Sequence, residues 1–72
     1  MPTLIAFRIQ LGWSKAEFAR QAGLSVQVII KAENGEPITT RSATKIAQAL
    51  SRSFEKVIMA QQIEGLNIRE DG

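Results

Sequence analysis

The sequence predicts an all-α fold of five helices, and three observations support it. Apolar residues recur at helical spacing, as Leu4, Phe7 and Leu11 do near the start of the chain. The apolar-periodic stretches are short and are separated by Gly or Pro. Ser or Thr, which cap helix N-termini, precedes four of them. A strand-like pattern appears only over residues 63–68.

The first two helices have clear end signals. Gly12 is placed to close the first helix in a left-handed conformation. The second helix opens with Ser14-Lys15-Ala16-Glu17, a capping box in which the hydroxyl accepts from the amide of Glu17 and the carboxylate reaches back. Trp13 precedes the capping serine, so we expect it to pack on Phe18 as a hydrophobic staple.

The third helix follows closely. Gly23 ends the second helix, and Ser25 is the expected cap of the third. Asn34-Gly35 ends the third helix, and residues 36–38 form the predicted loop after it.

Two further helices complete the prediction. Thr39 is the expected cap of the fourth, and Ser53 that of the fifth. The apolar positions of these two helices are Ala43, Ile46, Ala47 and Leu50, then Phe54, Val57 and Ile58.

The composition excludes several classes of function. The 72 residues include no His, Cys or Tyr, so the commonest general base, a thiolate nucleophile and nearly all zinc ligands are absent. No apolar run approaches the roughly 18 residues of a membrane span. We therefore expect one small cytoplasmic domain that is not an enzyme and binds no metal or cofactor.

The charge is distributed unevenly along the chain. Residues 1–56 contain eight of the nine basic residues and four acids, which gives this part a formal charge of +4. Residues 57–72 carry a formal charge of −2. A basic body favours a polyanionic partner such as nucleic acid.

The second and third helices form the informative unit. The turn from Gly23 to Ser25 is only about three residues, and so tight a connection makes two helices cross steeply. Ala19 is the small residue expected where the axes approach, and Ile29 is expected to face Phe18. This is helix-turn-helix geometry, in which the second helix enters the DNA major groove.

The outward face of the third helix carries polar side chains. At 100° per residue, Gln27, Lys31 and Asn34 lie opposite the inward Ile29. Gln can bind adenine through two hydrogen bonds, and Lys can donate to guanine or phosphate. The flanking Val28 and Ile30 suit either thymine methyl groups or a protein partner.

Several short motifs follow one another in a fixed register. They are Leu4-x-x-Phe7-Arg8, Gly12-x-Ser14-x-x-Glu17-Phe18-Ala19, Gly23-x-Ser25, Ile29-x-x-x-Glu33-Asn34-Gly35, Pro37-x-Thr39, Lys45-Ile46-Ala47-x-Ala49-Leu50 and Ser53-Phe54. With this pattern the chain resembles the lambda-repressor-like, Cro/XRE-type helix-turn-helix domains over about residues 3–58.

The resemblance implies DNA contacts at named positions. Lys15 stands where such domains usually place a Gln against a phosphate, and Arg41 matches a position that approaches phosphates or the minor groove in some members. Contacts to bases and phosphates concentrate at the start of the third helix and along its outer face. The positions implied there are Ser25, Val26, Gln27, Ile30, Lys31 and Asn34.

The resemblance also implies a structural pair, and the chain departs from the family at three positions. Arg8 and Glu33 match residues that form an internal salt bridge in relatives. Val26 and Ile30 are apolar where relatives usually carry polar residues, and Glu36 is acidic where many carry a base.

The resulting prediction is a lambda-repressor-like domain over residues 1–60 and a C-terminal extension over residues 61–72. Two roles are open for the extension: it packs back on its own chain as an extra helix or arm, or it forms a dimer contact. Residues 69–72 at its end are expected to fray. The protein is predicted to be a sequence-specific transcriptional regulator from a bacterium or phage. It is expected to act as a repressor that binds double-stranded DNA as a homodimer and is associated with the nucleoid.

The alternative is an antitoxin-like or other helical module whose main partner is a protein such as a toxin. Two sets of apolar residues support this alternative. They are Val28 and Ile30 of the third helix, and Ile58, Ile63, Leu66 and Ile68 near the C-terminus.

Overall fold

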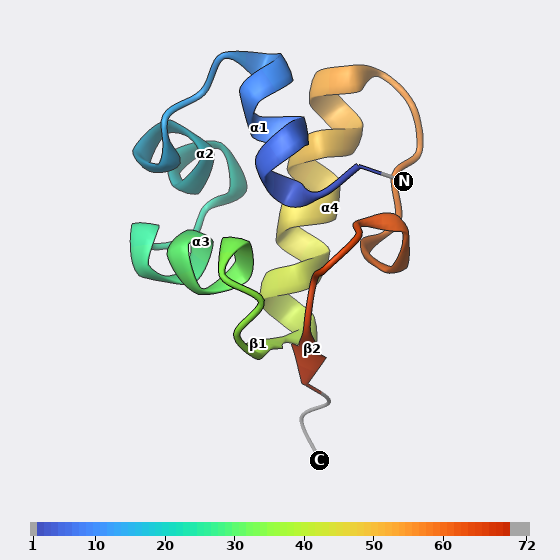
Figure 1. The fold of residues 1–72 in the computed structure, drawn as a ribbon. Helices are drawn as coiled ribbons and strands as arrows, with labels where there is room; N and C mark the ends of the chain where they lie inside the picture. Colours follow the sequence, from blue (N-terminus) through green and yellow to red (C-terminus); the bar gives the residue numbers. More distant parts are fainter. Residues whose placement is uncertain (1, 70–72) are drawn as a thin grey trace.

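The computed structural model describes residues 2–69 as four α-helices, one 3-10 helix and two short strands (Figure 1). None of the described helices is long and apolar enough to cross a membrane. The elements in chain order are α1 (Leu4–Leu11), α2 (Lys15–Ala22), α3 (Val26–Glu33), β1 (Ile38–Thr39), α4 (Thr40–Phe54), the 3-10 helix η1 (Ala60–Gln62) and β2 (Ile68–Arg69).

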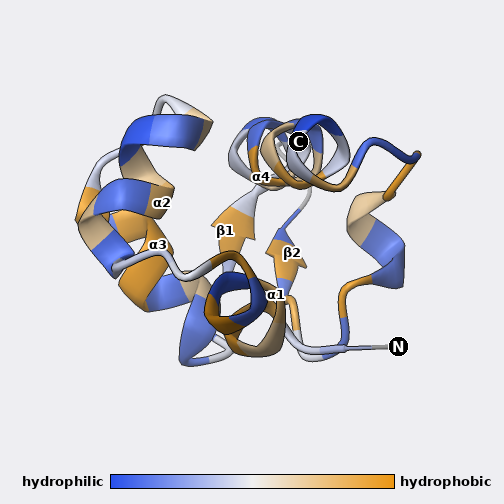
Figure 2. Cartoon of the chain, turned by 90° about the horizontal axis from the view of Figure 1, so that it is seen from above, coloured by the Kyte–Doolittle hydropathy of each residue, from blue (hydrophilic) through white to orange (hydrophobic). Residues whose placement is uncertain are grey.

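The core forms around α4, the longest helix. Its fully buried Ile46 and Leu50 belong to one apolar cluster with Phe18 of α2 and Ile29 of α3. Figure 2 shows β1 and β2 side by side, with α2 and α3 grouped together on the side of β1. The cluster thus joins α2 and α3 to the rest of the chain through side chains at the predicted apolar positions.

Most of the predicted helix ends are confirmed. Gly12 and Gly23 follow α1 and α2 with φ of 71° and 70°, the left-handed region that glycine enters without a steric cost. Thr39 is the N-cap of α4, and its Oγ1 accepts a hydrogen bond of 3.1 Å from the Ser42 amide.

Two expected caps form only in part. Ser14 Oγ accepts from the Glu17 amide at 3.0 Å, as predicted. The Glu17 carboxylate does not reach back to Ser14, however, because it accepts hydrogen bonds from Arg20 and Gln21 one turn later. Ser25 is the N-cap residue of α3, but its hydroxyl makes no cap hydrogen bond.

The predicted fifth helix is wrong. Ser53 does not begin a helix, because it lies inside the last turn of α4. Glu55 then takes a left-handed conformation with φ of 54°, which ends the helix. Ser51 holds the returning chain, since its Oγ accepts from the Ile58 amide at 3.0 Å. Val57 is therefore in an irregular segment and is 83% exposed.

The structure also forms a strand pair that the sequence analysis did not predict. The expected loop over residues 36–38 contains Ile38, which lies in β1 and pairs in parallel with Ile68 of β2. Ile68, the last of the strand-like residues 63–68, thus lies in one strand of a two-stranded sheet. We call residues 63–69 the C-terminal arm.

The C-terminal arm packs on its own chain. Ile63 is buried at 3% exposure in the main core cluster, and Leu66 and Ile68 pack against that cluster. The Glu64 amide donates to the carbonyl of Pro2 at 3.1 Å, which joins the arm to the start of α1. Arg69, where fraying was expected to begin, lies in β2, and residues 70–72 are outside the described residues.

Truncating Ile63 tests whether the arm stabilises the fold. Because this side chain is buried, we expect Ile63→Ala to lower the free energy of unfolding by about 2 to 5 kcal/mol and Ile63→Val by about 0.5 to 1.5 kcal/mol. Urea unfolding followed by circular dichroism measures both. Val57→Ala is the control, since an exposed side chain should change stability little. Equal losses for Ile63→Ala and Val57→Ala would contradict the packing described here.

Candidate nucleic-acid interface

The connection between α2 and α3 is the tight turn that the sequence predicts. Gly23 is the left-handed residue after α2, and the Leu24 amide donates to the carbonyl of Ala19 at 2.9 Å. Ala19 is 4% exposed, and Ile29 and Phe18 are fully buried. A small residue in α2 and an apolar pair between the helices therefore hold α3 against α2, as in a helix-turn-helix unit.

The buried and exposed sides of α3 agree with the predicted wheel. Ile29 and Ala32 are buried. The exposed residues of the segment are Ser25, Val26, Gln27, Lys31 and Asn34, all of them predicted DNA-contacting positions. Val28 and Ile30, which flank this face, are half-buried, in agreement with their expected partial exposure.

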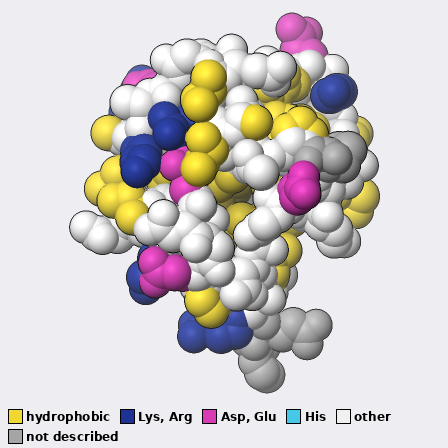
Figure 3. Space-filling view, in the orientation of Figure 1, with side chains coloured by type: hydrophobic (Ala, Val, Ile, Leu, Met, Phe, Trp, Pro, Cys, Tyr) yellow, Lys and Arg dark blue, Asp and Glu magenta, His cyan; other side chains and the backbone are white. Residues whose placement is uncertain are grey.

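The other two predicted contact residues also reach solvent. Lys15 is the first residue of α2 and Arg41 lies in the first turn of α4, and both are exposed. Within residues 2–69, neither of them nor Lys31 takes part in an ion pair. Figure 3 shows basic side chains at the end of the molecule formed by β1 and β2. The side chains of Lys15, Lys31 and Arg41 are therefore available to bind an anionic partner.

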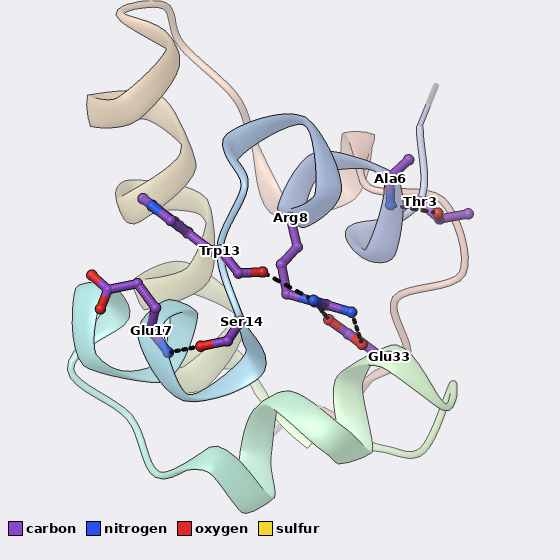
Figure 4. A network of polar contacts seen from close by, with 7 residues as sticks. All are labelled: Thr3, Ala6, Arg8, Trp13, Ser14, Glu17 and Glu33. Atoms are coloured by element: carbon purple, nitrogen blue, oxygen red, sulfur yellow. Dashed lines mark hydrogen bonds and ion pairs between the residues drawn. The ribbon is translucent and has the colours of Figure 1, made fainter.

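A largely buried ion pair holds the inner side of α3 (Figure 4). Arg8 of α1 donates through Nε to Glu33 Oε2 at 2.5 Å and through Nη2 to Oε1 at 3.3 Å. Its Nη1 donates to the carbonyl of Trp13 at 3.0 Å. The side chains of Arg8 and Glu33 are only 16% and 3% exposed. The predicted salt bridge is thus confirmed, and it ties α1 and the α1–α2 loop to the last turn of α3.

Aromatic packing and a surface ion pair fix α2. The rings of Trp13 and Phe18 lie 5.5 Å apart, which confirms the predicted staple. Arg20 forms a 2.5 Å ion pair with Glu17. The hydrogen bond from Arg20, followed by that from Gln21, lowers the pKa of Glu17, because both donate to its charged form. The same bond raises the pKa of Arg20.

The sequence analysis missed one contact that supports this unit. Arg52 of α4 donates through Nη2 to the carbonyl of Gln21 at 2.9 Å, near the end of α2. Its acceptor is a backbone group in another helix, so no spacing along the sequence indicates it.

A metal site and a groove away from α3 are the other kinds of site to consider in residues 2–69. Residues 2–69 contain no cluster of three or more His, Cys, Asp or Glu side chains able to hold a metal ion. A groove of about 520 Å³ lies between α4 and residues 58–61, and none of the predicted DNA-contacting residues line it.

Comparison with known proteins identifies a family. The family model described as helix-turn-helix matches residues 4–57, which span α1 to α4. No curated protein and no solved structure matches the chain. The C-terminal arm lies beyond the matched segment.

Removing Glu33 tests the buried ion pair. We expect Glu33→Ala to lower the free energy of unfolding by about 3 kcal/mol, because it leaves the largely buried guanidinium of Arg8 without its carboxylate. Thermal and urea unfolding measure the loss. The matched control is Glu17→Ala, which removes the acid of an exposed pair and should cost much less.

A double variant separates the charge from the packing. Arg8→Met combined with Glu33→Leu should recover most of the stability, since apolar replacements leave no uncompensated charge. If Glu33→Ala and Glu17→Ala are equally mild, the pair does not stabilise the fold as described.

Proposed function

Because the chain belongs to the Cro/C1-type helix-turn-helix family, a family of DNA-binding transcription regulators, we propose that it is a homodimeric repressor that inserts α3 into the DNA major groove. The observation that carries the proposal is the exposed face of α3. Gln27, Lys31 and Asn34 lie together on the side opposite the buried Ile29. A helix that is packed against the core on one face and exposes polar side chains on the opposite face is suited to contacts with base edges.

The residues divide by chemistry into two groups. Lys15, Arg41 and the hydroxyl of Ser25 bind phosphates and set the register on the duplex. Ser25 suits this role because its hydroxyl makes no cap hydrogen bond. Gln27 and Lys31 bind base edges, Gln27 through both atoms of its amide.

Asn34 and two apolar residues complete the proposed contacts. Asn34 is exposed just after α3 and extends the polar face to the groove or the backbone. Val26 is 36% exposed at the first position of α3, where its methyl groups suit a thymine methyl. Ile30 is half-buried, so it offers a smaller contact of the same kind.

Pairing of two chains follows from the energetics of DNA binding. A single domain with few phosphate contacts holds DNA weakly at physiological salt. Two domains place two recognition helices about 34 Å apart, one turn of the duplex. Repression requires only that the bound dimer cover a promoter, and nothing in this proposal requires a cofactor.

Exposed apolar side chains favour the alternative function, although Ile63 does not contribute to them. Ile63, one of the residues that suggested a protein partner, is buried in the core of the chain itself. Val57 and Met59 remain 83% and 51% exposed, and Met59 lines the groove beside α4. An antitoxin-like module would bind its partner through such apolar surface, with an affinity that salt changes little.

Selection from a random pool of duplex DNA at two salt concentrations, followed by sequencing, tests the proposed function. A homodimer that reads the major groove should enrich a two-fold symmetric site. Gln27→Ala, selected in parallel, should lose preference at one base position in each half-site, at a cost of about 1 to 3 kcal/mol for the correct base. Failure to retain DNA even at low salt would overturn the proposal.

Replacing Lys15 tests the phosphate contacts separately from base recognition. We expect Lys15→Ala to weaken binding to all sequences alike and to reduce the slope of log affinity against log salt by about one. Fluorescence anisotropy at several salt concentrations measures the slope. Lys56→Ala is the control, because Lys56 is also exposed but lies just after the C-terminal end of α4. Equal slopes for the two variants would contradict a phosphate contact at Lys15.

A further inference from the structure

The C-terminal arm ends beside the recognition helix. A groove of about 120 Å³ is lined by Val28 and Lys31 of α3, by Thr39 of β1, by Ser42 of α4 and by Arg69 of β2, among others. Arg69 is therefore next to the face that the proposed function assigns to DNA. It lies outside the segment that the family model matches, so the family likeness assigns it no role.

Hydrogen bonds fix the position of the arm beside α3. The Ile38 amide donates to the carbonyl of Asn67 at 2.9 Å, and Asn67 Nδ2 donates to the carbonyl of Gly35 at 3.3 Å. In the parallel pair of strands, Arg69 stands opposite Thr39. These bonds join the arm to the turn after α3 and to β1, so they hold the backbone of Arg69 in place relative to α3.

The side chain of Arg69 is directed outward by the strand. Ile68 packs against the core cluster, and successive side chains of a strand point to opposite faces. Arg69 is accordingly exposed, and within residues 2–69 it forms no ion pair. Arg69 and Lys31 both line the groove, and Arg41 precedes Ser42, another lining residue, in the sequence. In the sequence, Glu36 precedes Pro37 of this groove, and Glu70 and Asp71 follow Arg69.

We propose that Arg69 binds a DNA phosphate beside the recognition helix, so that the C-terminal arm forms part of the DNA interface. The inference rests on the proposed function, because it requires α3 to lie in the major groove. A helix in that groove has a phosphate backbone along each side, and the groove lined by Lys31 and Arg69 lies on the side of α3 that faces β1. A guanidinium suits this ligand because its planar fork donates two parallel hydrogen bonds to phosphate oxygens.

The test compares three variants by fluorescence anisotropy with a random-sequence DNA duplex at several salt concentrations. Arg69→Ala should weaken binding to all sequences and reduce the slope of log affinity against log salt by about 0.9, the value for one lost phosphate contact. Arg69→Lys should restore most of the slope, since lysine keeps the charge. Lys56→Ala is the matched control and should keep the slope of the unaltered protein.

The controls separate the possible outcomes. Circular dichroism should show unchanged unfolding for Arg69→Ala, because the side chain is exposed. If Lys15→Ala reduces the slope and Arg69→Ala behaves as Lys56→Ala does, the arm does not contact DNA and only this inference fails. If the unaltered protein does not bind DNA at low salt, the proposed function and this inference fail together. An effect of Arg69→Ala that Arg69→Lys does not relieve would also overturn a phosphate contact.

Discussion

The position of α3 depends on the ion pair between Arg8 and Glu33. The helices α1 and α3 have eight residues each, and helices this short are marginal in water without tertiary contacts. The guanidinium joins three parts of the chain, since it binds the last residue of α3 and the carbonyl of Trp13 from within α1. A buried charge is costly without its partner, so the pair permits one arrangement of these elements and penalises others.

Further contacts hold α3 from its other sides. The tight turn after Gly23 and the buried Ile29 fix its start and middle against α2. The arm binds the turn that follows it, through Asn67 and the carbonyl of Gly35. All of these contacts lie behind or beyond the exposed face, so the residues that hold α3 differ from those that it presents. A substitution on the outer face of α3 should therefore cost the fold little.

Local signals in the sequence predicted much of this structure, and non-local ones did not. Glycine at helix ends and the caps at Ser14 and Thr39 act within a few residues, so the chain shows them directly. The fifth helix was expected from an equally local signal at Ser53. It is absent because Ser51 bonds to residue 58 and turns the chain. The strand pair depends on residues 30 positions apart, and the placement of Arg69 depends on that pair. No periodicity indicates such a partner.

The ion pairs also determine which charges remain for a partner. Arg8 and Arg20 are paired with Glu33 and Glu17, so these four residues add nothing to the net charge and serve the fold. Burial of the Glu33 carboxylate leaves Lys31 as the one charged side chain on the exposed side of α3, within the residues that the structure describes. Because pairing removes the acid of α3 from the surface, a phosphate beside this helix meets a cation without a competing carboxylate from the same helix.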